Sequence, residues 1–268
     1  MSANITPEMI DRYATDGVVL VTGLFAEHLG LIEEAIEQNL ANPGPYAAEN
    51  VRPGDSGRFF DDYCNWQQID ALQKLIFTSD VGQVAAQLMQ SDTAQLFHDH
   101  ILVKEAGTSS ATPWHQDSPY YFVEGMQTIS FWTVVEPVTD ATLRCVRGSH
   151  LWPKPVMPKR WLSDENFYPD EDSYIAVPNP DRDGLDIAEW ALSPGDAVAF
   201  NFKILHGARG NQSASRRRAL SLRLVGDDAV YCTRPGRTSP PFPDHNMIEG
   251  QKLRQDWFPV IYPAETVS

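Results

Sequence analysis

The sequence has few cysteines and no long apolar run. Its three cysteines, Cys64, Cys145 and Cys232, are widely spaced among 268 residues and form no CxxC pair. Such a set builds neither a disulfide framework nor a zinc knuckle, and it favours a reducing compartment. No apolar stretch has the length needed to cross a bilayer, and the first residues lack the basic start and apolar segment of a secretory signal. We therefore expect a cytoplasmic protein with no membrane partner.

Positive charge is also scarce. The chain carries 21 lysines and arginines against 36 acidic residues, which gives a formal net charge of −15. This excess repels polyanions, so nucleic acid is not an expected partner, and a solvated acidic surface is its simplest interpretation. The hydrophobic share of 42% is ordinary for one globular domain. The composition leaves monomer and homo-oligomer both open.

The spacing of apolar residues is mostly helical up to about residue 90. Thr6-Pro7-Glu8 has the capping hydroxyl, proline and early acid of a helix start. Apolar residues recur every three or four positions from Glu27 onward, and again over residues 68–90. The intervening stretch 41–63 is rich in proline and glycine and is predicted to be a loop.

A period of two replaces the helical spacing over about residues 91–235. Short β-branched or aromatic segments occupy residues 94–104, 127–136, 142–147, 196–206 and 217–225. We predict a single domain over 1–268 of the mainly β class: a double-stranded β-helix (jelly roll, cupin-like) with the N-terminal helices packed outside. The stretch 152–190, rich in proline and aromatics, is predicted to be a lid-like insertion.

The segment Trp114-His115-Gln116-Asp117 places an imidazole and a carboxylate two residues apart. On an extended segment, positions i and i+2 point the same way, so both side chains are expected to face one cavity. Two histidines and one carboxylate form a facial triad that leaves three positions open on ferrous iron. His-x-Asp alone is a weak signal, because the chain has seven histidines and many acids.

A second histidine follows the turn Pro194-Gly195-Asp196. If residues 196–206 form one strand, His206 ends a face that is otherwise apolar, and Gly207 ends the strand and allows close approach of another backbone. Taken alone, His206 is equally typical of a buried core histidine with satisfied hydrogen bonds.

Eleven residues later, Arg217 begins a further predicted strand. Its odd positions, which include Ser221 and Arg223, form a polar face, whereas positions 220, 222 and 224 are leucines that belong against an apolar layer. A guanidinium on that polar face suits the far carboxylate of a dicarboxylate whose other end chelates iron, because its fork binds a carboxylate in two places. Arg216 and Arg218 are expected at the surface.

The combined pattern resembles the phytanoyl-CoA dioxygenase family, which comprises 2-oxoglutarate oxygenases on a double-stranded β-helix. The resemblance rests on WHQD (114–117), FWTVVE (131–136), RGSH (147–150), PGD (194–196), HG (206–207) and RRALSL (217–222). It implies that His115, Asp117 and His206 hold Fe(II), and that Arg217 binds 2-oxoglutarate, with O2 as the third reactant. It also places Gln116 and Trp132 in the wall of the co-substrate pocket.

The chain departs from the family pattern at two places. RGSH follows Asp140-Ala141 where the family usually shows Pro-Gly-Ser-His after an Asn-Gly pair. Ala208 stands where some members have a hydroxyl near the co-substrate, so that hydrogen bond is either missing or supplied by another group. Asp117 is present where related halogenases lack a carboxylate, and hydroxylation is therefore expected in place of halogenation.

Further residues are expected around the same pocket. His98-Asp99-His100 offers a cupin-like metal pair, but no third ligand follows at a fitting spacing, so His100 is assigned to the pocket wall. Lys104 shares its strand face and is a candidate partner for an anionic group. The expected substrate contacts are Tyr120, Tyr121, Trp161 and Arg223. The aromatic side chains either form a cage, which would favour a cationic group, or cover the barrel mouth.

The sequence therefore predicts an Fe(II)- and 2-oxoglutarate-dependent dioxygenase that hydroxylates a C–H bond of a small molecule and releases succinate and CO2. A metal-dependent hydrolase or isomerase on a cupin-type barrel is one alternative, and it would not need Arg217. A non-catalytic binding protein on the same fold is another. The substrate, including whether it is linked to CoA, is not determined by the sequence.

Overall fold

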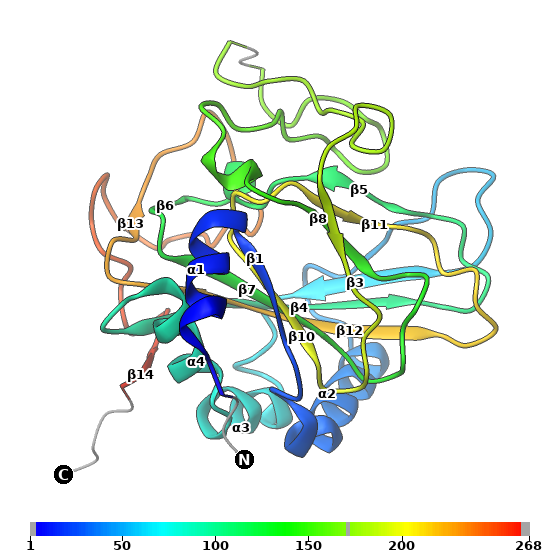
Figure 1. Ribbon diagram of the computed structural model, residues 1–268, viewed down its shortest axis with the longest axis horizontal. Coiled ribbons are helices and arrows are strands. Elements are labelled where there is room, and N and C mark those ends of the chain that lie inside the picture. Colours follow the sequence, from blue (N-terminus) through cyan, green and yellow to red (C-terminus); the bar gives the residue numbers. More distant parts are fainter. Residues whose placement is uncertain (1–3, 170–171, 264–268) are drawn as a thin grey trace.

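We analysed a computed structural model that describes residues 4–169 and 172–263. Most of its strands lie in one antiparallel sheet, in the order β1-β10-β7-β12-β4-β3-β2, with β14 paired to β4 (Figure 1). These strands are β1 (Val18–Val21), β2 (Ala48–Glu49), β3 (Phe59–Tyr63), β4 (Ala94–Lys104), β7 (Thr128–Val134), β10 (Ala197–Phe200), β12 (Arg217–Val225) and β14 (Val260–Tyr262). The central strands β7, β12 and β4 are buried on both faces, which their apolar and β-branched residues permit.

A smaller antiparallel sheet forms the second layer. Its order is β5-β11-β8-β9, and its strands are β5 (Thr112–His115), β11 (His206–Ala208), β8 (Leu143–Val146) and β9 (Ile187–Glu189). A short ribbon pairs β6 (Val123–Glu124) with β13 (Val230–Tyr231). Residues of both larger sheets line one cavity. The predicted mainly β jelly roll is confirmed.

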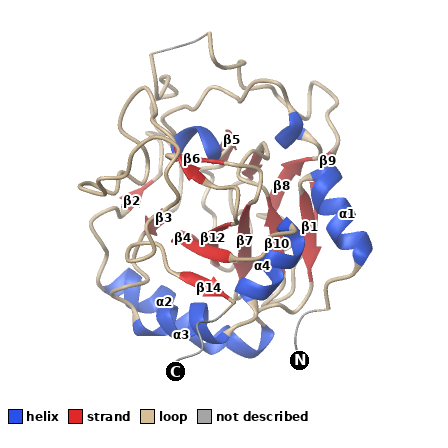
Figure 2. Ribbon diagram, turned by 90° about the vertical axis from the view of Figure 1, so that its left-hand side faces the viewer, coloured by secondary structure: helices blue, strands red, loops and turns tan. Residues whose placement is uncertain are grey.

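Within the described residues, four α-helices pack outside the main sheet. They are α1 (Pro7–Asp16), α2 (Leu29–Ala41), α3 (Asp70–Thr78) and α4 (Val81–Met89). The Thr6 hydroxyl accepts the N–H of Met9 and begins α1, and Gly17 ends it in the left-handed conformation. Figure 2 shows α2 and α3 side by side along one edge of the molecule. Leu220, Leu222 and Leu224 of β12 join the apolar faces of these helices in one core, as predicted. Among the helices of the described ranges, none combines the length and hydropathy needed to span a membrane.

The N-terminal ninety residues are not only helical, and this corrects the expectation for residues 41–63. The strand β1 pairs with β10, and β3 pairs with β4, so both belong to the main sheet. β3 contains Asp61 and Asp62, which look like turn residues in the sequence. Asp62 accepts hydrogen bonds from Asn39 and from the N–H of Gly44, each at 2.7 Å. Partners far along the chain thus make a buried acidic strand possible.

The predicted strand 196–206 is also wrong in its second half. β10 ends at Phe200, and Asn201 turns the chain: its amide donates to the carbonyls of Met126 and Thr128, at 2.8 and 3.2 Å, and accepts the N–H of Lys203. His206 therefore begins β11 in the second sheet and does not end a strand of the first. Gly207 lies within β11, where an added Cβ would meet the carbonyl oxygen of Thr112 at 3.0 Å. The close backbone approach expected at this glycine is confirmed.

The described residues of the segment 152–190 run mostly as loop. Three short 3-10 (η) helices lie outside this segment, at Ala26–His28, Ser118–Tyr120 and Ser149–Leu151. In Figure 1 the described part of this segment (yellow-green) lies at the end of the molecule opposite α2 and α3. Tyr120 ties it to the barrel, because the Tyr120 hydroxyl donates to the carbonyl of Lys159 at 2.7 Å and accepts the N–H of the same residue at 2.8 Å. Its role as a lid stays a prediction.

Candidate metal centre and adjoining cavity

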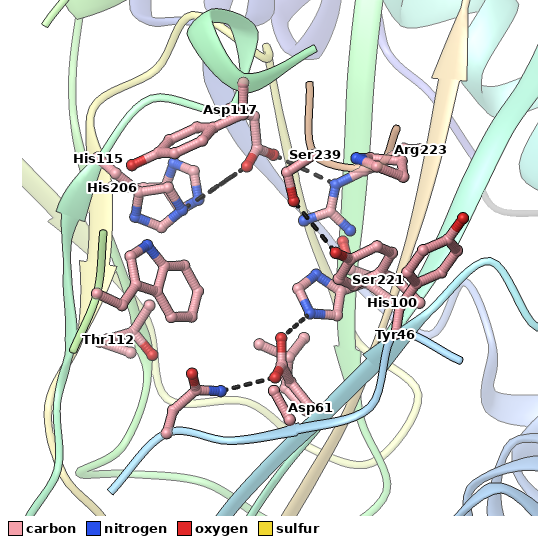
Figure 3. Close-up of a pocket in the computed structure, with 18 of the residues that line it drawn as sticks. Tyr46, Asp61, His100, Thr112, His115, Asp117, His206, Ser221, Arg223 and Ser239 are labelled. Carbon is pink, nitrogen blue, oxygen red and sulfur yellow. Dashed lines mark hydrogen bonds and ion pairs between the residues drawn. The ribbon is translucent and has the colours of Figure 1, made fainter. Parts of the chain in front are cut away.

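Two histidines and one aspartate meet between the ends of β5 and β11. His115 is the last residue of β5 and lies directly opposite His206, the first residue of β11. Asp117 follows β5 with helical backbone angles at the start of the η element Ser118–Tyr120, so the carboxylate joins the histidines through a turn and not along an extended strand. One ligand atom from each of the three lies within 4.8 Å of the other two, and all three residues are buried (Figure 3).

Backbone carbonyls orient both imidazoles toward the carboxylate. Nδ1 of His115 donates to the carbonyl of Pro113 at 2.8 Å, and Nδ1 of His206 donates to that of Ile204 at 3.0 Å. These bonds leave the Nε2 lone pairs free, 3.7 and 3.9 Å from Oδ1 of Asp117. Such outer hydrogen bonds fix the tautomer and ring orientation of metal-ligating histidines.

The electrostatics of the site favour the metal-binding protonation states. Burial by itself would raise the pKa of Asp117, but the Arg223 guanidinium and the two histidines outweigh it and hold the pKa well below its usual range. Oδ2 lies 3.3 Å from Nε of Arg223 and 3.4 Å from the Ser130 hydroxyl, which leaves Oδ1 for the histidine side. Burial, and then His115, lower the pKa of His206 to about 3. A neutral imidazole at His206 and an ionised carboxylate at Asp117 fit a divalent transition metal.

The metal-ligand group borders a cavity of about 410 Å³ between the two sheets. Arg217 lies in its wall, buried, with its guanidinium carbon 5.3 Å from the centre of the Trp132 ring. Nε and Nη2 of Arg217 have no hydrogen-bond partner within the described part of the chain. Burial lowers the pKa of Arg217 to about 10, so it remains a cation at neutral pH. A buried cation with two free donors suits a carboxylate ligand.

The structure brings most of the predicted site residues to this cavity. Besides the metal-ligand group and Arg217, the cavity is lined by Trp132, His100, Tyr120, Tyr121, Trp161 and Arg223. The Trp161 ring, from the predicted lid, lies 5.1 Å from that of His115. Arg223 also forms the ion pair with Asp117, a partner that the sequence did not indicate. His98 lines the cavity beside His100, but among the described residues only His115, Asp117 and His206 form a group whose ligand atoms lie close enough to hold one metal ion.

Gln116 and Lys104 do not line the cavity, which corrects their assignment to the co-substrate pocket. Gln116 points to the other side of the chain, where it donates to the carbonyl of Lys203 and accepts the N–H of Val156 at 2.7 Å. It therefore holds the start of the 152–190 segment. Nζ of Lys104 lies 4.4 Å from the centre of the Phe59 ring and donates to the carbonyl of Arg209 at 3.0 Å.

One wall of the cavity was missed in the sequence. It comes from the 41–63 stretch, which contributes Tyr46, Asn50, Asp61 and Tyr63. The only available signal was the run Phe59-Phe60-Asp61-Asp62-Tyr63, whose aromatics indicate a strand more than a loop. Thr112, paired opposite Ala208, also lines the cavity and has the hydroxyl group that Ala208 lacks.

Comparison with known proteins gives the family. Residues 13–219 match the model of the phytanoyl-CoA dioxygenase (PhyH) family, and the chain belongs to that family. Among curated proteins, no sequence matches this chain.

Solved structures with the same fold include three enzymes. The non-heme, alpha ketoglutarate dependent carbocyclase SnoK from nogalamycin biosynthesis is 21% identical, with a TM-score of 0.74 and 96% of each chain covered. The alpha ketoglutarate dependent epimerase SnoN, also from nogalamycin biosynthesis, is 21% identical, with a TM-score of 0.75 and 97% of each chain covered. EctD from S. alaskensis, solved with 2-oxoglutarate and 5-hydroxyectoine, is 18% identical, with a TM-score of 0.67 over 93% of this chain and 86% of that one. At these identities the likeness concerns the fold.

Proposed function

We propose that this protein is an Fe(II)- and 2-oxoglutarate-dependent dioxygenase that hydroxylates a C–H bond of a small molecule. One observation carries the proposal: a buried His115-Asp117-His206 group, with both Nε2 atoms free, shares a cavity with a buried arginine whose donors are unpaired. Membership of the PhyH family agrees with it. In the overall reaction, the substrate C–H bond, O2 and 2-oxoglutarate yield a C–OH bond, succinate and CO2.

The chain's residues have separate tasks in this reaction. His115, Asp117 and His206 would hold the metal on one side only, which leaves the positions facing the cavity open. Bound ferrous iron supplies the activation of O2, for which 2-oxoglutarate is the reductant. Arg217 would bind the carboxylate of 2-oxoglutarate and orient it, with Trp132 packed against the guanidinium.

The predicted lid would keep water out of the cavity. Trp161 and Phe167 line the cavity from this segment, and Tyr120 fixes it through both backbone groups of Lys159. A closed, apolar cover protects reactive species from side reactions with water. The cavity volume of about 410 Å³ fits a small molecule and not a polymer.

Hydroxylation is the simplest outcome for this site. SnoK and SnoN are a carbocyclase and an epimerase, and EctD was solved with a hydroxylated compound, so proteins of this fold reach several products. Asp117 supplies a third protein ligand, which argues against halide binding at the metal. These points support hydroxylation over halogenation, and the substrate decides between hydroxylation and further rearrangement.

The test is anaerobic loading with Fe(II) and 2-oxoglutarate, followed by exposure to O2 and measurement of succinate. Wild type should release succinate slowly without substrate and faster with an active compound from a metabolite screen. His115→Ala should abolish both, whereas His28→Ala, a histidine outside the cavity, should behave as wild type. Turnover of a screened compound without 2-oxoglutarate, unaffected by Arg217→Ala, would instead favour the metal-dependent hydrolase or isomerase.

A further inference from the structure

The cavity has a buried polar wall formed by β3, β4 and β12, which we call the polar wall. It consists of Asp61 from β3, His98 and His100 from β4, and Ser221 and Arg223 from β12. His98 is paired with Arg223 across the sheet, and His100 with Ser221, so the four side chains form a compact square. Figure 3 shows His100, Ser221 and Arg223 across the open space from His115, His206 and Thr112.

Three atoms of the polar wall have no hydrogen-bond partner among the residues that the structure describes. They are Nε2 of His98, Oγ of Ser221 and Nη1 of Arg223. Buried polar atoms are nearly always paired in folded proteins, because an unpaired one loses its hydration without compensation. Three such atoms on adjacent strands, facing a cavity, indicate that a ligand supplies the missing partners.

The two imidazoles present acceptors to the cavity. Nε2 of His100 lies 2.8 Å from Oδ2 of Asp61, whose Oδ1 accepts the Asn50 amide at 2.6 Å. The carboxylate can only accept, so Nε2 carries the proton and Nδ1 is left as an acceptor. Nδ1 of His98 donates to the carbonyl of Asp99 at 3.0 Å, so its free Nε2 is an acceptor too. Burial lowers the pKa of both histidines and keeps them neutral.

The charge of Arg223 is already balanced. Its Nε faces Asp117 at 3.3 Å, and its Nη1 is a buried donor without a partner among the described residues. The wall therefore offers one donor, two imidazole acceptors and one hydroxyl, without an uncompensated charge. A carboxylate would face the imidazole lone pairs and Asp61, and an ammonium group would face Arg223. Hydroxyl groups satisfy all these atoms, because each can donate and accept at once.

Aromatic rings complete this half of the cavity. Tyr63 lies against His100 with ring centres 5.4 Å apart, and Tyr46 stacks on Tyr63 at 5.0 Å. Trp161 and Phe167 line the cavity from the lid segment. Flat apolar faces beside a row of hydrogen-bonding groups suit a ring that has C–H faces and hydroxyls on its edge.

We propose that the polar wall receives two neighbouring hydroxyl groups of an uncharged, hydroxylated ring, and that this class of molecule is the substrate. The assignment of the ring as substrate rests on the function proposed above, whereas its binding to the wall does not. The hydroxyls donate to His98 and His100 and accept from Arg223 and Ser221. This holds the ring across the cavity from the metal-ligand group.

A matched panel of three ring compounds tests the proposal: cis-cyclohexane-1,2-diol, cyclohexanecarboxylate and cyclohexylammonium. Their affinities for the full-length protein loaded with Fe(II) and 2-oxoglutarate are compared anaerobically by ligand-observed NMR. We expect the diol to bind at least about 10-fold more tightly than either charged ring, because the difference reflects one or two hydrogen bonds. Preference for the carboxylate or the ammonium ring, or no detectable binding of the diol, would overturn the proposal.

Substitutions in the polar wall test whether the diol binds there. His100→Phe and Ser221→Ala should each lower the affinity for the diol about 5- to 10-fold. Ser163→Ala, which removes an exposed hydroxyl at the rim of the same cavity, should not change it. Equal diol affinity in wild type and His100→Phe would also overturn the proposal.

Binding of 2-oxoglutarate to each protein, measured separately by calorimetry, keeps the two proposals apart. If wild type binds no iron or 2-oxoglutarate but still binds the diol through His100, the dioxygenase function fails and the hydroxyl site stands. If both co-reactants bind normally and the diol does not, only the hydroxyl site fails.

Discussion

Replacing Arg217 by methionine is expected to stabilise the protein without ligand and to abolish its stabilisation by 2-oxoglutarate. Burial lowers the pKa of Arg217 to about 10, and two of its nitrogens have no partner in the described residues. A shift of that size corresponds to ~3 kcal/mol of unfavourable free energy for the buried cation. The contact with Trp132, 5.3 Å from the ring centre, offsets about 1–2 kcal/mol of this. Without ligand, Arg217→Met should therefore raise the free energy of unfolding by about 1–2 kcal/mol.

Urea unfolding with Fe(II) under anaerobic conditions measures both effects. At 2-oxoglutarate concentrations near 100 times its dissociation constant, wild type should gain about 2.7 kcal/mol, and Arg217→Met should gain almost nothing. Arg216→Met is the matched control, because this partly exposed arginine forms a surface ion pair with Glu37 at 3.3 Å and should change stability by less than about 0.5 kcal/mol. A methionine variant that is less stable without ligand, yet equally stabilised by 2-oxoglutarate, would refute the reasoning.

Three further predictions concern single-residue substitutions. Burial, and then Arg217, lower the pKa of Lys104 to about 6. Between about pH 6 and pH 10 the Lys104 amine is therefore neutral in the folded state and protonated in the unfolded state. The free energy of unfolding of the wild type rises with pH in this range, because the unfolded state binds more protons. In urea unfolding at pH 7, Lys104→Met should have a free energy of unfolding about 2–4 kcal/mol above that of wild type, and this difference should shrink toward pH 10. A difference that stays constant with pH would contradict the lowered pKa. Arg223→Met should weaken Fe(II) binding about 10- to 100-fold in calorimetry, because Asp117 loses the partner that orients it; unchanged affinity would show that this ion pair is dispensable. Gly17→Ala should lower the free energy of unfolding by about 2–4 kcal/mol, measured as a lower melting temperature. Gly17 has a φ of +73°, and a Cβ added there would collide with His150. A variant as stable as wild type would mean that the end of α1 can shift.

The candidate metal ligands stand out in the sequence because their chemistry is unusual for their surroundings. A histidine and an acid two residues apart, a lone histidine within an apolar stretch and an arginine on the polar face of a strand each contradict simple burial rules. Together they indicated His115, Asp117, His206 and Arg217, which the structure places around one cavity. The long strand 94–104 and the strand 217–225 were predicted to the residue, since both have the two-residue period of a strand and lie between clear turns.

The features that the sequence did not predict depend on contacts between residues far apart in the chain. Gln116 was assigned to the wrong side, because motif position does not show that its amide would bind Lys203 and Val156. The strand 196–206 was predicted as continuous, because the break at Asn201 arises from carbonyls more than seventy residues away. Arg223 was predicted as a substrate contact and does line the cavity, but its ion pair with Asp117 was not indicated by the sequence.

The sequence by itself determined the fold class, most of the N-terminal helices and the candidate ligands for iron and a dicarboxylate, since these follow from local periodicity and from the chemistry of each residue type. Only the tertiary structure decided that residues 41–63 add the strands β3 and β2 to one edge of the main sheet, and that Asp61, His98, His100, Ser221 and Arg223 share one wall. The physical reason is that strand pairing joins residues far apart in the chain. Which donors and acceptors remain free for a ligand is known only when every other hydrogen bond has been made.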